Sequence, residues 1–143
     1  IYKVLRPGGK LVLFTSTPEQ MKGYWLCHYF PNIMTRSCNQ MPTYETMEHT
    51  MRSVGFRQIN KELYSIRPTQ EDHFLYTAKD DPSRYIDPEF RKGISTFTAL
   101  SEPNELANGL THLAADITSG YWKKIRANYN HDLGDYLFIV AER

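Results

Sequence analysis

This sequence of 143 residues has few cysteines, no long apolar run and almost no excess of one charge. No apolar stretch approaches the roughly 20 residues that a membrane-spanning helix needs, so we expect no membrane partner. Cys27 and Cys38 are the only cysteines, which favours free thiols in a reducing cytoplasm over a disulfide framework. The 17 basic and 16 acidic residues leave a net charge of +1, too little to attract nucleic acid. These features together predict a cytoplasmic protein with no nucleic-acid partner.

Short-spaced metal ligands and a signal peptide are also lacking. The five histidines have no Cys, Asp or Glu partners at the helical or loop spacings of metal sites, so we expect no metal site. The first residue is Ile, and Ile1–Leu5 is typical of the last turn of a helix that began earlier. We therefore expect a truncated domain without a signal peptide.

The apolar pattern predicts a strand followed by a helix at the start of the chain. Lys10–Thr15 is apolar on both faces, as in a strand buried in the middle of a parallel sheet. Thr15–Pro18 can cap a helix over 19–29, which Phe30–Asn32 would end. The buried face of this helix, at helical spacing, comprises Met21, Tyr24, Trp25 and His28.

Three more elements are predicted before residue 80. Thr43 is a suitable N-cap for a helix that ends at Val54–Gly55. Phe56–Arg67 then follows as a strand. Thr69–Asp72 resembles a capping box and predicts a helix through about Lys79.

A helical insert is predicted over about 80–120. Asp87–Pro88 is typical of a helix start, and a second helix begins near Ser101. Residues 121–130 fit either a helix or a twisted strand, and Asp135–Glu142 is a strongly apolar strand. The buried stripe of the second helix consists of Leu106, Leu110, Leu113 and Ile117.

This order of elements predicts a single α/β domain over residues 1–143 with a sheet of three strands. The first strand requires burial on both faces, and an exposed central strand would promote aggregation. We therefore expect either that neighbouring strands are missing or that a second copy supplies them, as a homodimer through the exposed sheet edge.

The residues Val4–Lys10 read Val-Leu-Arg-Pro-Gly-Gly-Lys. Proline ends a helix, and two glycines permit the positive φ angles that turn the chain into a strand. With Leu11–Leu13 after it, this segment resembles the turn before the fifth strand of class I S-adenosylmethionine-dependent methyltransferases. Later segments resemble the same family in order, and the insert resembles that of the broad type 11 group of small-molecule methyltransferases. These segments are Val54–Phe56, Gly93–Phe97, Gly109–Leu110, Asp116–Gly120 and Asp132–Ala141.

The resemblance implies a partial Rossmann-like methyltransferase sheet, made of strands five to seven of the family with the last strand antiparallel. It also implies S-adenosylmethionine as the cofactor and a small molecule as the methyl acceptor. The sequence has no Gly-x-Gly element, and Gly8 and Gly9 are its only adjacent glycines. No cofactor-binding residue of the family can therefore be placed in this chain. We expect the chain to supply the C-terminal sheet and the acceptor-side lid, and to be inactive by itself.

Ligands of such folds bind at the carboxyl ends of parallel strands, which points to Thr15–Thr17 and the helix after them. Thr17, Tyr24 and Trp25 are candidates for substrate binding, and His28 is a candidate general base. The same side chains could instead pack the helix onto the sheet. For isolated residues of these types, packing is the more frequent role.

Two other functions stay open. The chain could be a truncated, non-catalytic α/β domain that acts through self-association or partner binding. A nucleotide-dependent reductase has similar layering, but the sequence lacks the Gly-x-Gly-x-x-Gly element that such an enzyme needs.

Overall fold

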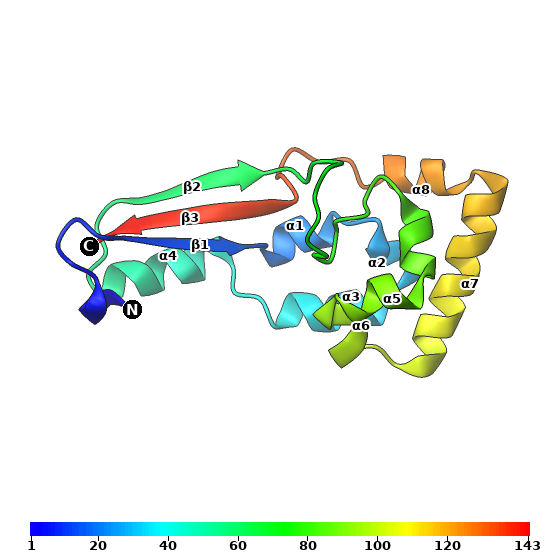
Figure 1. The fold of residues 1–143 in the computed structure, drawn as a ribbon, viewed down its shortest axis with the longest axis horizontal. Helices are drawn as coiled ribbons and strands as arrows, with labels where there is room; N and C mark the ends of the chain where they lie inside the picture. Colours follow the sequence, from blue (N-terminus) through cyan, green and yellow to red (C-terminus); the bar gives the residue numbers. More distant parts are fainter.

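The computed structural model describes all residues, 1–143, and its sheet has three strands (Figure 1). The strands β1 (Lys10–Thr15), β2 (Ile59–Tyr64) and β3 (Tyr136–Glu142) lie in the order β1-β3-β2. β3 pairs antiparallel with both neighbours, so β1 and β2 run parallel to each other. The last strand of the sequence is antiparallel to its neighbours, as expected, but it takes the middle position in the sheet that was predicted for the first strand.

One face of the sheet is covered by helix α4 (Tyr44–Ser53), which lies directly against it in Figure 1. Alternate residues of β3 point to this face, and Ile139 is fully buried there. Met47 and Met51 of α4 and Phe56 after it complete a small separate core. Thr43 caps α4 as predicted, because its hydroxyl accepts from the backbone N–H of Thr46 at 3.2 Å.

The prediction that β1 is buried on both faces is wrong for this chain. β1 lies at an edge of the sheet, because it pairs only with β3. Val12, on the face opposite α4, is 58% exposed, and Leu11, Leu13 and Phe14 are only partly buried. The strand thus has the composition of an internal strand and the position of an edge strand.

A second, helical layer lies beyond one end of the strands (Figure 1). None of its helices is long and apolar enough to cross a membrane. The elements of the chain besides the three strands and α4 are η1 (Tyr2–Val4), α1 (Pro18–Lys22), α2 (Leu26–Tyr29), α3 (Pro31–Asn39), η2 (Pro82–Ile86), α5 (Pro88–Lys92), α6 (Ser95–Ala99), α7 (Pro103–Ser119) and α8 (Trp122–Ala127).

The single helix predicted over 19–29 is divided into α1 and α2. The break covers residues 23–25, and a Cβ at Gly23 would lie 2.2 Å from the His131 ring, so a larger residue there would displace that side chain. α2 ends at Tyr29, close to the predicted end, but Pro31 then starts α3 instead of ending helical structure. Proline is tolerated at a first helical position because its missing N–H has no partner there in any case.

The helix predicted over 69–79 does not form, and that segment is a series of turns. Thr77 stabilises the turns, because its hydroxyl accepts from Phe74 N at 2.8 Å and donates to Asp72 O at 2.9 Å. These local bonds compete with helical ones. β2 is also shorter than predicted, and the ambiguous residues 121–130 contain the helix α8.

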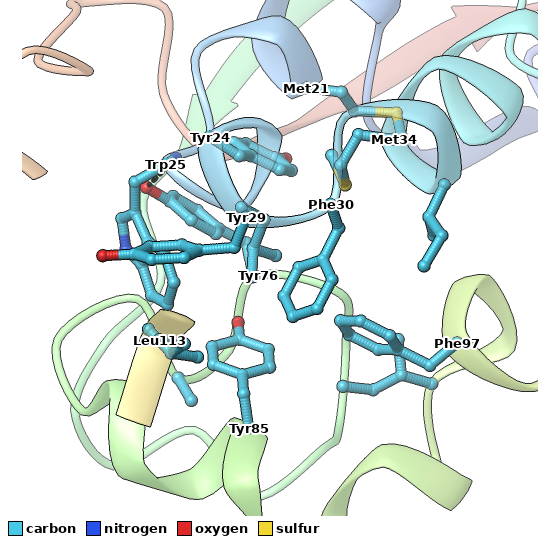
Figure 2. Close-up of a cluster of buried hydrophobic side chains, with 14 of the residues drawn as sticks. Met21, Tyr24, Trp25, Tyr29, Phe30, Met34, Tyr76, Tyr85, Phe97 and Leu113 are labelled. Carbon is cyan, nitrogen blue, oxygen red and sulfur yellow. Dashed lines mark hydrogen bonds between the residues drawn. The ribbon is translucent and has the colours of Figure 1, made fainter. Parts of the chain in front are cut away.

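The core of the helical layer is built largely from aromatic rings (Figure 2). The rings of Tyr24 and Tyr76 stack with centroids 3.9 Å apart and planes 8° apart. Trp25 meets Tyr85 edge-on at 5.4 Å and Trp122 edge-on at 5.7 Å. Such arrangements stabilise a core beyond the area that they bury.

The predicted stripe of α7 packs against this core, and its Leu113 is fully buried. Gly109 lies one turn earlier, where a Cβ would be 2.4 Å from Tyr29 O and 2.5 Å from the Phe30 ring. The close approach of α7 to α2 therefore requires glycine, although glycine weakens a helix.

We predict that Gly109→Ala lowers the free energy of unfolding by about 1 to 3 kcal/mol, because overpacking outweighs the gain in helix propensity. The matched control is Asn108→Ala at an exposed neighbouring position of α7, which should leave stability equal or slightly higher. Urea denaturation followed by circular dichroism measures both. A stabilised Gly109→Ala variant would contradict the packing described for α7.

Candidate functional site

A cavity of about 540 Å³ opens at the carboxyl end of β1. Ser16, the first residue after the strand, contributes to its wall, and Tyr136 of β3 lies beside it. The other walls come from α1, α3, the turns at 72–75 and the segment that joins α5 to α6. Its volume is within the range of small-molecule sites, roughly 300 to 1,000 Å³.

The strand leads into this site through a capped helix start. Thr17 N donates to Gln20 Oε1 at 2.9 Å, and Gln20 N donates to Thr17 Oγ1 at 3.3 Å, which together form a capping box at α1. Gln20 Nε2 also donates to Leu133 O at 2.9 Å. These bonds fix the direction in which the chain leaves β1 and so the position of Ser16.

A pair of hydroxyl groups joins α3 to α6 in the cavity wall. Ser37 Oγ lies 3.0 Å from Thr96 Oγ1, and both residues are buried. Their side chains are 59 positions apart in the sequence, so helix packing alone brings them together.

The imidazole of His73 lies at the exposed rim of the cavity with Asp72. Its ring packs on Phe90 with centroids 4.6 Å apart, and its Nε2 lies 3.4 Å from a guanidinium nitrogen of Arg84. The donor and the acceptor of this exposed contact depend on the tautomer of the imidazole. His73 is thus a polar part of the cavity wall whose Nε2 faces Arg84.

The four residues predicted for the site line none of the three principal cavities. Tyr24 and Trp25 are fully buried, and Trp25 Nε1 donates to Lys79 O at 3.0 Å. Thr17 caps α1, and His28 is an exposed residue whose ring meets Tyr29 edge-on at 4.9 Å. Their predicted roles in substrate binding and catalysis gain no support from these positions, and packing explains Tyr24 and Trp25.

Four of the lining residues, 93–96, lie in the segment Gly93–Phe97 that resembles the insert of the family. Ser37 carries no sequence motif, and His73 lies in a segment that was expected to be helical. The prediction that ligands meet at the end of the first strand also points to this place, through Ser16.

A second cavity, of about 690 Å³, lies on α8 and the loops that flank the start of β3. It is rich in charge, and Lys79 there forms a largely buried ion pair with Asp135. Arg126 pairs with Asp80 at its exposed rim. The two cavities thus differ in chemistry, since charged pairs line the second one and hydroxyl and apolar groups line the first.

The start of α1 differs from a nucleotide-binding turn. This helix directly follows β1, but its first residue is Pro18, which has no N–H, and Gln20 N is bonded to Thr17 Oγ1. A nucleotide site in such folds uses a glycine-rich turn with free amides. The Gly8–Gly9 turn leads into a strand instead, and Gly8 N donates to Arg143 O at 3.0 Å.

The thiol of Cys27 is not activated by its neighbour His28. Burial raises the pKa of Cys27 to about 11, and its Sγ donates to Met21 O at 3.3 Å. A raised pKa keeps the group as a neutral thiol below that pH, whereas a nucleophilic cysteine needs a lowered one.

We predict that alkylation of Cys27 by iodoacetamide, measured in a Cys38→Ala variant, accelerates about tenfold per pH unit from pH 8 to 10, because the rate follows the thiolate fraction. In urea the rate should level off near pH 9 to 10, as for an ordinary thiol of pKa about 8.5. A native rate that levels off below pH 9 would show that the thiol is activated.

Of the comparisons with known proteins, only the one with solved structures gives a match. A scan of protein-family models finds no match, and neither does a search of curated proteins. Among solved structures, the chain is similar to a protein assigned by name to the methyltransferases of an antibiotic biosynthesis pathway, from Anabaena variabilis. The TM-score is 0.76 and the sequence identity 27%, over 94% of this chain and 55% of that one. The chain therefore spans about half the length of the protein that it matches, and its fold is methyltransferase-like.

Proposed function

We propose that this chain forms the C-terminal, acceptor-side part of an S-adenosylmethionine-dependent methyltransferase that acts on a small molecule. The observation that carries the proposal is the sheet order β1-β3-β2, with its reversed middle strand, in a chain that matches a methyltransferase at a TM-score of 0.76. The Pro7–Gly9 turn before β1 agrees with it in sequence.

Methyl transfer needs few protein groups beyond those that hold the two reactants in line. The cavity at the end of β1 supplies one half of that arrangement, because its walls can bind and orient an acceptor. Phe74, Leu75 and Leu100 give it apolar walls that exclude water. The cofactor half of the arrangement would come from residues outside this chain, since the chain has no Gly-x-Gly turn.

We predict that the 143-residue chain does not bind S-adenosylmethionine or S-adenosylhomocysteine in the micromolar range by isothermal titration calorimetry. The reason is the lack of a Gly-x-Gly turn, together with a start of α1 at which Pro18 has no N–H and Gln20 N is bonded to Thr17 Oγ1. Micromolar binding by this chain would overturn the division of roles proposed here.

The complementary experiment uses the coding sequence before Ile1. A Gly-x-Gly-x-Gly element roughly 70 to 100 residues before Pro7 is expected there if the chain is the second half of such an enzyme. Protein made from the joined sequence should then bind the cofactor and transfer its labelled methyl group to a small molecule. Joined protein that binds the cofactor but methylates only protein or nucleic acid would refute the proposed substrate class.

A second function, self-association through the edge of β1, is favoured by the exposure of Val12. An apolar edge strand without a partner is a template for pairing with another strand. We predict a dimer that forms with increasing concentration in size-exclusion chromatography with light scattering. Val12→Lys should weaken it, while Val54→Lys, at another exposed valine on α4's C-terminal side, should not. A monomer at all concentrations would remove this function.

A further inference from the structure

The cavity at the end of β1 has no positively charged wall. Sixteen residues line it, and no lysine or arginine is among them. Asp72 and His73 lie at its exposed rim, and the buried phenol of Tyr136 also lines it. A carboxylate or phosphate that entered would lose hydration without gaining a partner of opposite charge, and that loss is costly. The chemistry of the wall therefore selects against anions.

Half of the lining is apolar. Eight of the sixteen residues are hydrophobic, and Met21 and Ile94 among them are almost fully buried. A ligand with a mainly hydrocarbon surface would bury that surface here, with a gain in free energy proportional to the area removed from water.

The hydroxyl pair of Ser37 and Thr96 has a hydrogen-bond donor to spare. Two hydroxyl groups carry two protons, and the bond between Oγ and Oγ1 uses only one of them. Neither group bonds to any other atom of the chain. Both side chains line the cavity, so an oxygen atom of a ligand that displaces water from it can accept the remaining proton.

We propose that the methyl acceptor is an uncharged, largely apolar molecule that places a carbonyl or hydroxyl oxygen on the Ser37–Thr96 pair. That the ligand is the methyl acceptor rests on the proposed function, whereas the binding of such a ligand in this cavity does not. The pair orients the ligand within the cavity, and the apolar walls hold its hydrocarbon part. Anions are disfavoured because no lysine or arginine lines the cavity.

Three bicyclic probes of equal ring size separate these features. They are 1-tetralone, which carries a carbonyl, tetralin, which carries none, and tetralin-1-carboxylate, which is an anion. Equilibrium dialysis against the 143-residue chain should give 1-tetralone the highest affinity. Tetralin should bind about two- to tenfold more weakly, as expected for loss of one neutral hydrogen bond. The carboxylate should bind more weakly than tetralin.

The double variant Ser37→Ala/Thr96→Val tests the hydroxyl pair. Removing both hydroxyls leaves no orphaned partner, so the fold should persist, which circular dichroism checks. Its affinity for 1-tetralone should fall to the level of tetralin, while its affinity for tetralin stays the same or rises. The matched control is Thr98→Val, at an exposed threonine of α6 outside the lining, which should change neither affinity.

A second variant, Ala99→Phe, places a ring at the wall of the cavity and should weaken 1-tetralone and tetralin alike. The inference is overturned if the carboxylate binds as well as 1-tetralone, if the double variant keeps the preference for the ketone, or if Ala99→Phe leaves binding unchanged. Because no cofactor takes part, these outcomes are independent of the proposed function. Correct probe binding without methyl transfer by the joined protein would refute the proposed function alone.

Discussion

The arrangement of the whole molecule depends on Asp135, the residue that precedes β3. Its carboxylate accepts from Ile66 N at 2.7 Å and pairs with Lys79, and its carbonyl accepts from the hydroxyl of Tyr24. One buried residue thus joins the end of β2, the turns after it and the helical layer to the start of β3. A buried ion pair is no strong source of stability by itself, but loss of one partner leaves a buried charge without compensation. The geometry that Asp135 imposes is therefore specific, and it sets where the helices meet the sheet.

The position of the cavity follows from this junction and from the strand directions. β1 and β2 run parallel, so both have their carboxyl ends at the helical layer, and β3 starts there because it runs the other way. At this end of the sheet, the chain therefore leaves β1, leaves β2 and enters β3. Backbone that connects these points cannot pack as regular helix everywhere, and the short helices α1, α3 and α6 leave space between them. The cavity lies among these connections, with Ser16 after β1 and Tyr136 at the start of β3 in its wall.

The sequence was most informative where structure is local. The apolar strands, the Thr43 cap and the α7 stripe were all predicted, because each depends on residues within a few positions. The turns at 69–79 were not, since Thr77 stabilises them through bonds that a capping-box pattern does not reveal. At the site, the sequence indicated the end of β1 and the segment Gly93–Phe97, but not the contact between Ser37 and Thr96. Ser37 and Thr96 meet through packing of α3 on α6, and no spacing in the sequence records a contact between helices so distant along the chain.

The helical layer and the sheet differ in how far their apolar side chains are buried. Beyond the strands, the aromatic core is closed, with Tyr24, Trp25 and Tyr85 fully buried (Figure 2). At the sheet, β1 has a free edge and Val12 remains 58% exposed. Whatever covers β1 in a larger assembly, therefore, does so on the side away from the closed core. The walls of the cavity belong mainly to that closed side, so they should keep their shape in the isolated chain. Our proposal therefore assigns recognition of the acceptor to the helical layer of this chain, and it assigns the cofactor to residues outside the chain.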